Sequence, residues 1–160
     1  MGLDMFVYLR KSGKYESSIR LGNTNVGLYP KELEKFEKEI LKRNFASKET
    51  DTIYQVGYFR KANAIHNWII ENCANGIDNC TPVYLTEEKI AELIDITEEV
   101  LSKESDPEDV LPTTEGFFFG STEYDDYYYR DVQYAKELFS EILDFLKEHD
   151  DYTVEYHASW

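Results

Sequence analysis

The order in which strand-like and helix-like patterns follow one another is the strongest constraint on the fold of this chain. Short segments rich in β-branched and aromatic residues predict strands at 3–9, 53–59, 83–85 and 152–159. Apolar residues that recur every three or four positions predict helices over 30–43, 60–73, 86–101 and about 121–148. Because strands and helices do not alternate regularly, the sequence predicts an α+β domain, with a small antiparallel or mixed sheet covered by about four helices.

Local signals refine these boundaries. Pro30 suits the first position of a helix, and Thr86 is a natural N-cap that is followed by two glutamates in the first turn. Ser121 or Thr122 is expected to cap the last helix. The segment 116–120, three phenylalanines between two glycines, is expected to be a buried strand or a wedge of aromatic core. The first and last strands could pair.

The length of the chain and the absence of long apolar runs indicate one globular domain. A chain of 160 residues matches the usual size of a single domain, and no linker or internal repeat divides it, so one domain over 1–160 is predicted. No stretch approaches the roughly 18 apolar residues of a membrane helix, and the opening residues do not resemble a secretion signal. We therefore expect a cytoplasmic protein without a membrane partner.

The charge of the chain is negative and unevenly distributed. The net charge is −15, and residues 1–85 hold 12 basic and 10 acidic side chains whereas residues 86–160 hold 5 and 22. A field of this sign repels a phosphate backbone, so direct nucleic-acid binding is not expected. An anion, if one binds, should lie among N-terminal residues. The simpler interpretation of the acidic half is solvated helix surface that keeps the protein soluble.

The two cysteines do not indicate a metal site or a disulfide framework. Cys73 and Cys80 are too few for such a framework, and free thiols are expected. Their spacing lacks the close pairs by which zinc motifs are recognised. The sequence therefore predicts neither a metal nor another cofactor.

The first candidate binding segment is the predicted helix 60–73. Its apolar positions should face the sheet, while amides, a guanidinium and aromatic rings gather elsewhere on it. Cations at a helix start, next to free backbone amides, attract anions, and an indole can stack on a ring. The alternative interpretation is an ordinary solvated face with a half-buried tryptophan and a histidine that is satisfied by the backbone. The candidate ligand-binding residues here are Arg60, Lys61, Asn63, His66, Asn67 and Trp68.

The second candidate segment is rich in tyrosine and carboxylates. Five of the thirteen tyrosines lie between Tyr124 and Tyr134, and tyrosine offers a large contact area at low entropic cost. Carboxylates at 123, 125 and 126 could hold a cation or act as an acid–base pair, although nothing in the sequence fixes their geometry. The alternative interpretation is a charged helix cap with tyrosines packed on the sheet. The candidate ligand-binding residues here are Ser121, Glu123, Tyr124 and Asp125.

These segments also carry a resemblance. The opening MGLDM, the segment GYFRKANAIHNW at 57–68, the segment LPTTEGFFFGSTEYD at 111–125 and the closing SW resemble a group of small acidic proteins of bacteriophages and prophages. The resemblance runs over nearly the whole chain. It implies a phage origin and therefore the cytoplasm of a host cell, and it carries over no functional residues. Small phage accessory proteins commonly act by binding.

The sequence leaves three specific functions open, besides a structural or assembly role that would show as a stable oligomer without any ligand. The first is a non-catalytic binding protein whose pocket, formed by both segments, takes a small nucleotide-like ligand and could serve in counter-defence. The second is an acidic inhibitor that mimics DNA and binds a basic host protein through its C-terminal half. The third is a metal-assisted hydrolase, in which His66 would act with the carboxylates at 123–126. Because the common catalytic motifs are absent, no catalytic residues are predicted. Neither the ligand, the partner nor the oligomeric state follows from the sequence.

Overall fold

The computed structural model describes residues 2–11, 31–36, 41–43 and 52–160. Five strands and four α-helices are present in these ranges, together with one short 3-10 helix, η1. Their bounds, in chain order, are β1 Asp4–Lys11, η1 Lys31–Phe36, β2 Leu41–Arg43, β3 Thr52–Arg60, α1 Asn63–Cys73, β4 Val83–Leu85, α2 Glu87–Ser102, α3 Pro107–Val110, α4 Asp126–Glu148 and β5 Tyr152–Ser159. Among the described residues, no helix combines the length and the apolar character that crossing a membrane requires.

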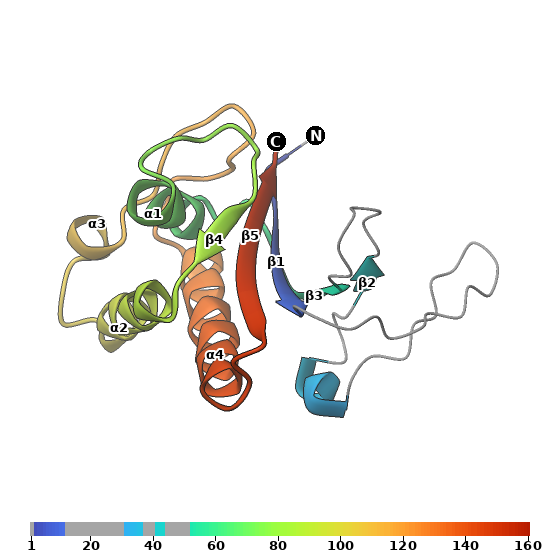
Figure 1. The fold of residues 1–160 in the computed structure, drawn as a ribbon. Coiled ribbons are helices and arrows are strands. Elements are labelled where there is room, and N and C mark those ends of the chain that lie inside the picture. Colours follow the sequence, from blue (N-terminus) through green and yellow to red (C-terminus); the bar gives the residue numbers. More distant parts are fainter. Residues whose placement is uncertain (1, 12–30, 37–40, 44–51) are drawn as a thin grey trace.

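The sheet is antiparallel throughout and has the strand order β2-β3-β1-β5-β4. The predicted α+β class is therefore confirmed. The first and last strands pair over their full length, from Asp4 opposite Ser159 to Lys11 opposite Tyr152, as the sequence suggested. Figure 1 shows the consequence, because the labelled N- and C-terminal ends lie side by side at one end of the sheet.

One face of the sheet carries the main core. Along β5 buried residues alternate with more exposed ones, and β1 buries Met5, Val7 and Leu9 completely. Helices α1, α2 and α4 lie together on this side of β1 and β5 (Figure 1). Gly57 in β3 allows a close approach, since a Cβ there would lie 2.3 Å from Cδ2 of Leu138 in α4.

The strongest helical patterns are confirmed. Thr86 caps α2 and accepts a hydrogen bond from the backbone N–H of Lys89, with Glu87 and Glu88 in the first turn. The predicted face of the last helix is buried, as are the alternate residues of the last strand. These elements have a long, unbroken period, so the pattern alone identifies them.

The prediction for 30–43 is wrong. Residues 31–36 form a 3-10 helix that buries Leu33 and Phe36, and residues 41–43 form the edge strand β2 paired with β3. Leu33 and Phe36, three residues apart, are enough for a single helical turn only. At residues 41–43, backbone pairing with β3 outweighs the helical pattern. Pro30, the expected helix start, lies outside the described residues.

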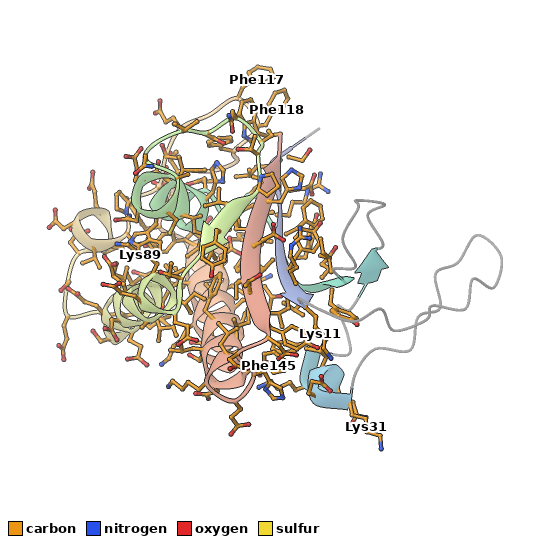
Figure 2. All side chains as sticks on the ribbon, viewed as in Figure 1. Lys11, Lys31, Lys89, Phe117, Phe118 and Phe145 are labelled. Atoms are coloured by element: carbon orange, nitrogen blue, oxygen red, sulfur yellow. The ribbon has the colours of Figure 1, made fainter. Side chains whose placement is uncertain are left out.

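Three further boundaries differ from the predictions. Arg60 ends β3, so α1 begins three residues later than expected. Asp125, not Ser121 or Thr122, caps the last helix. The segment 116–120 is a turn rather than a buried strand: Phe117 is 95% exposed, and Figure 2 shows Phe117 and Phe118 at the tip of a loop. Of its three phenylalanines, Phe119 packs against the core, so the expected aromatic wedge is reduced to one residue.

Candidate ligand-binding cleft

A cleft of about 280 Å³ lies where four parts of the chain meet. These parts are the end of β3, the start of α1, the loop that precedes α4 and the first turns of α4. The two segments singled out in the sequence therefore form one cleft. Its charged lining residues are Arg60, Lys61, Arg130, Glu123, Asp125 and Asp131, and its other lining residues are Ala62, Asn63, Ala64, Ile65, Thr113, Gly120, Ser121, Tyr127, Tyr128 and Val132.

Asn63 holds the loop against α1. Its side chain is buried, and Nδ2 donates to the carbonyl oxygens of Phe119 (3.1 Å) and Ser121 (2.8 Å). Its Oδ1 accepts from the backbone N–H of Thr114 at 3.0 Å. Both donors and the acceptor of this amide are in use. Asn63 therefore shapes the cleft instead of offering its amide to a ligand, which corrects its expected role.

The N-terminus of α1 is left uncapped at the cleft. The N-cap residue is Ala62, and no described side chain accepts from the first-turn amides of this helix. In contrast, Thr86, Asp106 and Asp125 cap the other α-helices. The first amides of a helix need an acceptor and carry partial positive charge. An anionic group in the cleft would supply that acceptor.

Lys61 adopts a left-handed backbone conformation beside this helix end. Its φ is +59°, and its N–H donates to the carbonyl of Leu3 at 2.8 Å. The Lys61 side chain runs between Gly2 and Gly120. A Cβ atom added at Gly2 would lie 3.2 Å from the Cε of Lys61, and one added at Gly120 would lie 3.0 Å from the Cβ of Lys61. Such a conformation costs a residue other than glycine roughly 1 kcal/mol. The chain therefore keeps a lysine where glycine would be less strained.

The first turns of α4 form the opposite wall. Asp125 caps the helix, and its Oδ1 accepts from the N–H groups of Tyr127 and Tyr128. Tyr127 is exposed, and the guanidinium of Arg130 lies 4.9 Å from the centre of its ring. This wall thus presents an aromatic ring, a cation and hydrogen-bonding groups to the cleft.

Asp131 is a half-buried carboxyl group that lines the cleft. Its side chain is half-buried, and it forms no hydrogen bond or ion pair with any described residue. Burial raises its pKa to about 6; Arg130 opposes this shift and Asp125 adds to it. A carboxyl group that is partly removed from water usually has a partner, so its isolation in a cleft marks it as a candidate functional group.

His66 does not belong to the cleft, and its expected role is corrected. The ring is 1% exposed, with Nδ1 2.7 Å from the hydroxyl of Tyr156 and Nε2 2.9 Å from the Oδ2 of Asp78. Since a carboxylate only accepts, Nε2–H donates to Asp78, while Nδ1 shares the second hydrogen bond with the Tyr156 hydroxyl. Burial raises the pKa of Tyr156 well above its ordinary value, so this hydroxyl keeps its proton. Both ring nitrogens are occupied, and the expected catalytic pairing of His66 with the carboxylates at 123–126 is not formed.

Three further candidates also lie outside the cleft. Trp68 is 8% exposed and packs in the core, while Asn67 is half-buried and does not line the cavity. Tyr124 packs edge-on against Tyr128, with ring centres 4.9 Å apart, and its hydroxyl accepts from the N–H of Thr113. Arg60, Lys61, Ser121, Glu123 and Asp125 lie at the cleft as expected, and Asn63 contributes structurally.

Sequence reasoning missed Tyr127, Arg130 and Asp131 as lining residues. Their spacing of three and four places them on one face of α4, directly after its N-cap. That spacing is present in the sequence, but it indicates a shared helix face only once Asp125 is identified as the N-cap. Thr113 had no local signal, because its position depends on how the loop folds back.

Comparisons with protein-family models, with curated proteins and with solved structures gave no match. The residues that the structure describes contain no group of three or more His, Cys, Asp or Glu side chains placed to hold a metal ion.

Proposed function

We propose that this chain is a binding protein whose cleft takes a small ligand with an anionic group, of the nucleotide type. The observation that carries the proposal is that Arg60, Lys61 and the uncapped start of α1 all line one cleft. Cationic side chains and free helix amides together favour a phosphate. The exposed ring of Tyr127 beside them offers a surface on which a planar base can stack.

The resemblance to phage proteins gives this proposal a biological setting. A phage accessory protein with such a cleft would bind a host nucleotide in the cytoplasm and withdraw it from signalling. This counter-defence role rests on the resemblance together with the chemistry of the cleft. It needs no catalytic residue.

Calorimetry with inorganic pyrophosphate and with the four common ribonucleoside monophosphates tests the binding proposal. We expect Lys61→Ala and Arg60→Ala to weaken binding about 10-fold each, because a hydrogen bond to a charged group is lost. Lys147→Ala is the matched control, since Lys147 is 61% exposed on α4 and does not line the cleft. Absence of binding to every one of these probes would refute the proposal.

The acidic surface of α2 and α3 supports a second candidate function, the DNA-mimicking inhibitor. Exposed carboxylates gather on these helices and on the turn between them, at Glu87, Glu88, Asp95, Glu98, Glu99, Glu104, Asp106, Glu108 and Asp109. Two further carboxylates of the acidic C-terminal half, Asp125 and Asp131, line the cleft instead.

A basic, DNA-binding protein would recognise such a surface mainly by charge, so its affinity should fall steeply with salt. The combined variant Glu98→Gln, Glu99→Gln and Asp109→Asn should weaken this binding strongly. Affinity for a basic partner that is the same in low salt and in about 0.5 M salt would exclude the mechanism.

A further inference from the structure

Asp131 raises a question that anion binding alone does not answer. The cations of the cleft account for a ligand's negative group, yet a half-buried carboxyl with no described partner also lines it. Taking a carboxylate out of water is unfavourable unless donors replace the water. A bound ligand is the available source of those donors.

The charges around Asp131 indicate which kind of hydrogen-bond donor a ligand would present to it. Arg130 follows Tyr127 on the same helix, Arg60 and Lys61 approach from the junction of β3 and α1, and one oxygen of Asp125 already serves as a helix cap. Besides the carboxylates of Glu123 and Asp125, a ligand ammonium group would meet three cations in this cleft. Uncharged donors avoid that repulsion, which favours hydroxyl groups over amines.

The size of the cleft further limits the kind of ligand that can bind. A volume of about 280 Å³ lies just below the usual range for small-molecule sites, roughly 300 to 1,000 Å³. Such a cleft suits a sugar phosphate better than a whole nucleotide. The base would then lie at the mouth, where the ring of Tyr127 is 68% exposed. A sugar held between phosphate-binding cations and a carboxylate would turn its hydroxyls toward the carboxylate.

We propose that Asp131 accepts hydrogen bonds from the two vicinal hydroxyls of a ribose, so that the cleft selects ribonucleotides over deoxyribonucleotides. This inference rests on the proposed function, because the phosphate must first be held by Arg60 and Lys61. A carboxylate has enough lone pairs to accept from both hydroxyls at once. An acidic side chain on ribose hydroxyls is a known solution in nucleotide sites of other folds.

The test compares AMP, 2′-deoxy-AMP and 2′,3′-dideoxy-AMP by calorimetry on the whole chain. At about pH 7.5 Asp131 is ionised, since its pKa is about 6. We expect the dideoxy compound to bind at least about 10-fold more weakly than AMP, with the 2′-deoxy compound between them. In Asp131→Asn the three affinities should converge, while Asp144→Asn, an exposed carboxylate of the same helix, should keep the wild-type order.

The outcomes separate the two proposals. Equal affinities of the wild-type chain for AMP and dideoxy-AMP would overturn ribose selection and leave nucleotide binding intact. Discrimination that persists in Asp131→Asn would also overturn it, because another residue would then contact the hydroxyls. If neither pyrophosphate nor any nucleotide binds, the proposed function fails and the ribose inference fails with it. The wild-type comparison needs no variant, so a folding defect cannot hide the result.

Discussion

The two sides of helix α1 differ in how completely their polar groups are satisfied. On the buried side, His66, Tyr156 and Asp78 form a network in which both ring nitrogens of the histidine are used, and the indole Nε1–H of Trp160 also donates to Asp78 at 3.2 Å. At the N-terminal end, the helix has no side-chain cap, Lys61 holds a left-handed conformation and Asp131 has no described partner.

This difference separates residues that stabilise the fold from residues that are available for binding. A buried polar network with every group paired rigidifies the structure and holds β5 against α1. Unpaired and strained groups cost stability, and proteins retain them mainly at functional sites. The contrast therefore predicts opposite results for substitutions at the two sites: lost stability in the network, and gained stability with lost binding in the cleft.

His66→Ala should have the largest effect. It removes a 1% exposed side chain and leaves the Tyr156 hydroxyl and Asp78 without their partner. We expect the free energy of unfolding, measured with urea, to fall by about 3 kcal/mol. The affinity of the folded protein for pyrophosphate should change less than about 2-fold. Lost binding at unchanged stability would show that the network belongs to the site.

Asp131→Asn should stabilise the protein. The pKa of Asp131 is raised to about 6 in the folded chain, so its contribution to stability is fully present below about pH 4 and is lost as pH rises through 6. Asparagine stays uncharged at every pH and therefore avoids the cost of a partly buried negative charge. We expect the variant to gain about 1 kcal/mol near pH 7, after allowance for partial exposure, and almost nothing near pH 4.

Urea unfolding of both chains across this pH range measures the difference. Asp144→Asn serves as the control, because the Asp144 side chain is 77% exposed and should show no such pH dependence. A stability difference that grows as pH falls would contradict the assigned direction of the pKa shift.

Lys61→Gly should give the smallest change in stability and the most informative one. Glycine adopts φ = +59° without strain, so we expect a gain of about 0.5 kcal/mol together with weaker pyrophosphate binding. Lys103→Gly is a matched control: Lys103 also has a left-handed φ, +58°, but it ends α2 away from the cleft. The control should gain stability and keep its affinity. Equal pyrophosphate affinity in both variants would show that Lys61 does not contribute to binding.

Sequence reasoning predicted well those elements whose signal is local and repeated. The alternation at 152–159, the face of α4 and the cap at Thr86 all came from patterns that a few neighbouring residues specify. It predicted poorly where pairing with a distant strand decides the structure. Residues 41–43 belong to a sheet edge because β3 lies beside them, and nothing in their own composition shows it.

The sequence by itself determined the fold class, the uneven charge and the two segments that supply the candidate site. Only the tertiary structure decided how the residues within those segments divide their roles. His66 and Trp68 lie in the core, whereas Arg60 and Lys61 line the cleft with Asp131. The physical reason is that burial and hydrogen bonding depend on what packs against a residue from far along the chain. Helical spacing fixes only which side chains of α1 share a face. The contacts of those side chains come from distant residues, namely Tyr156, Asp78 and the loop before α4.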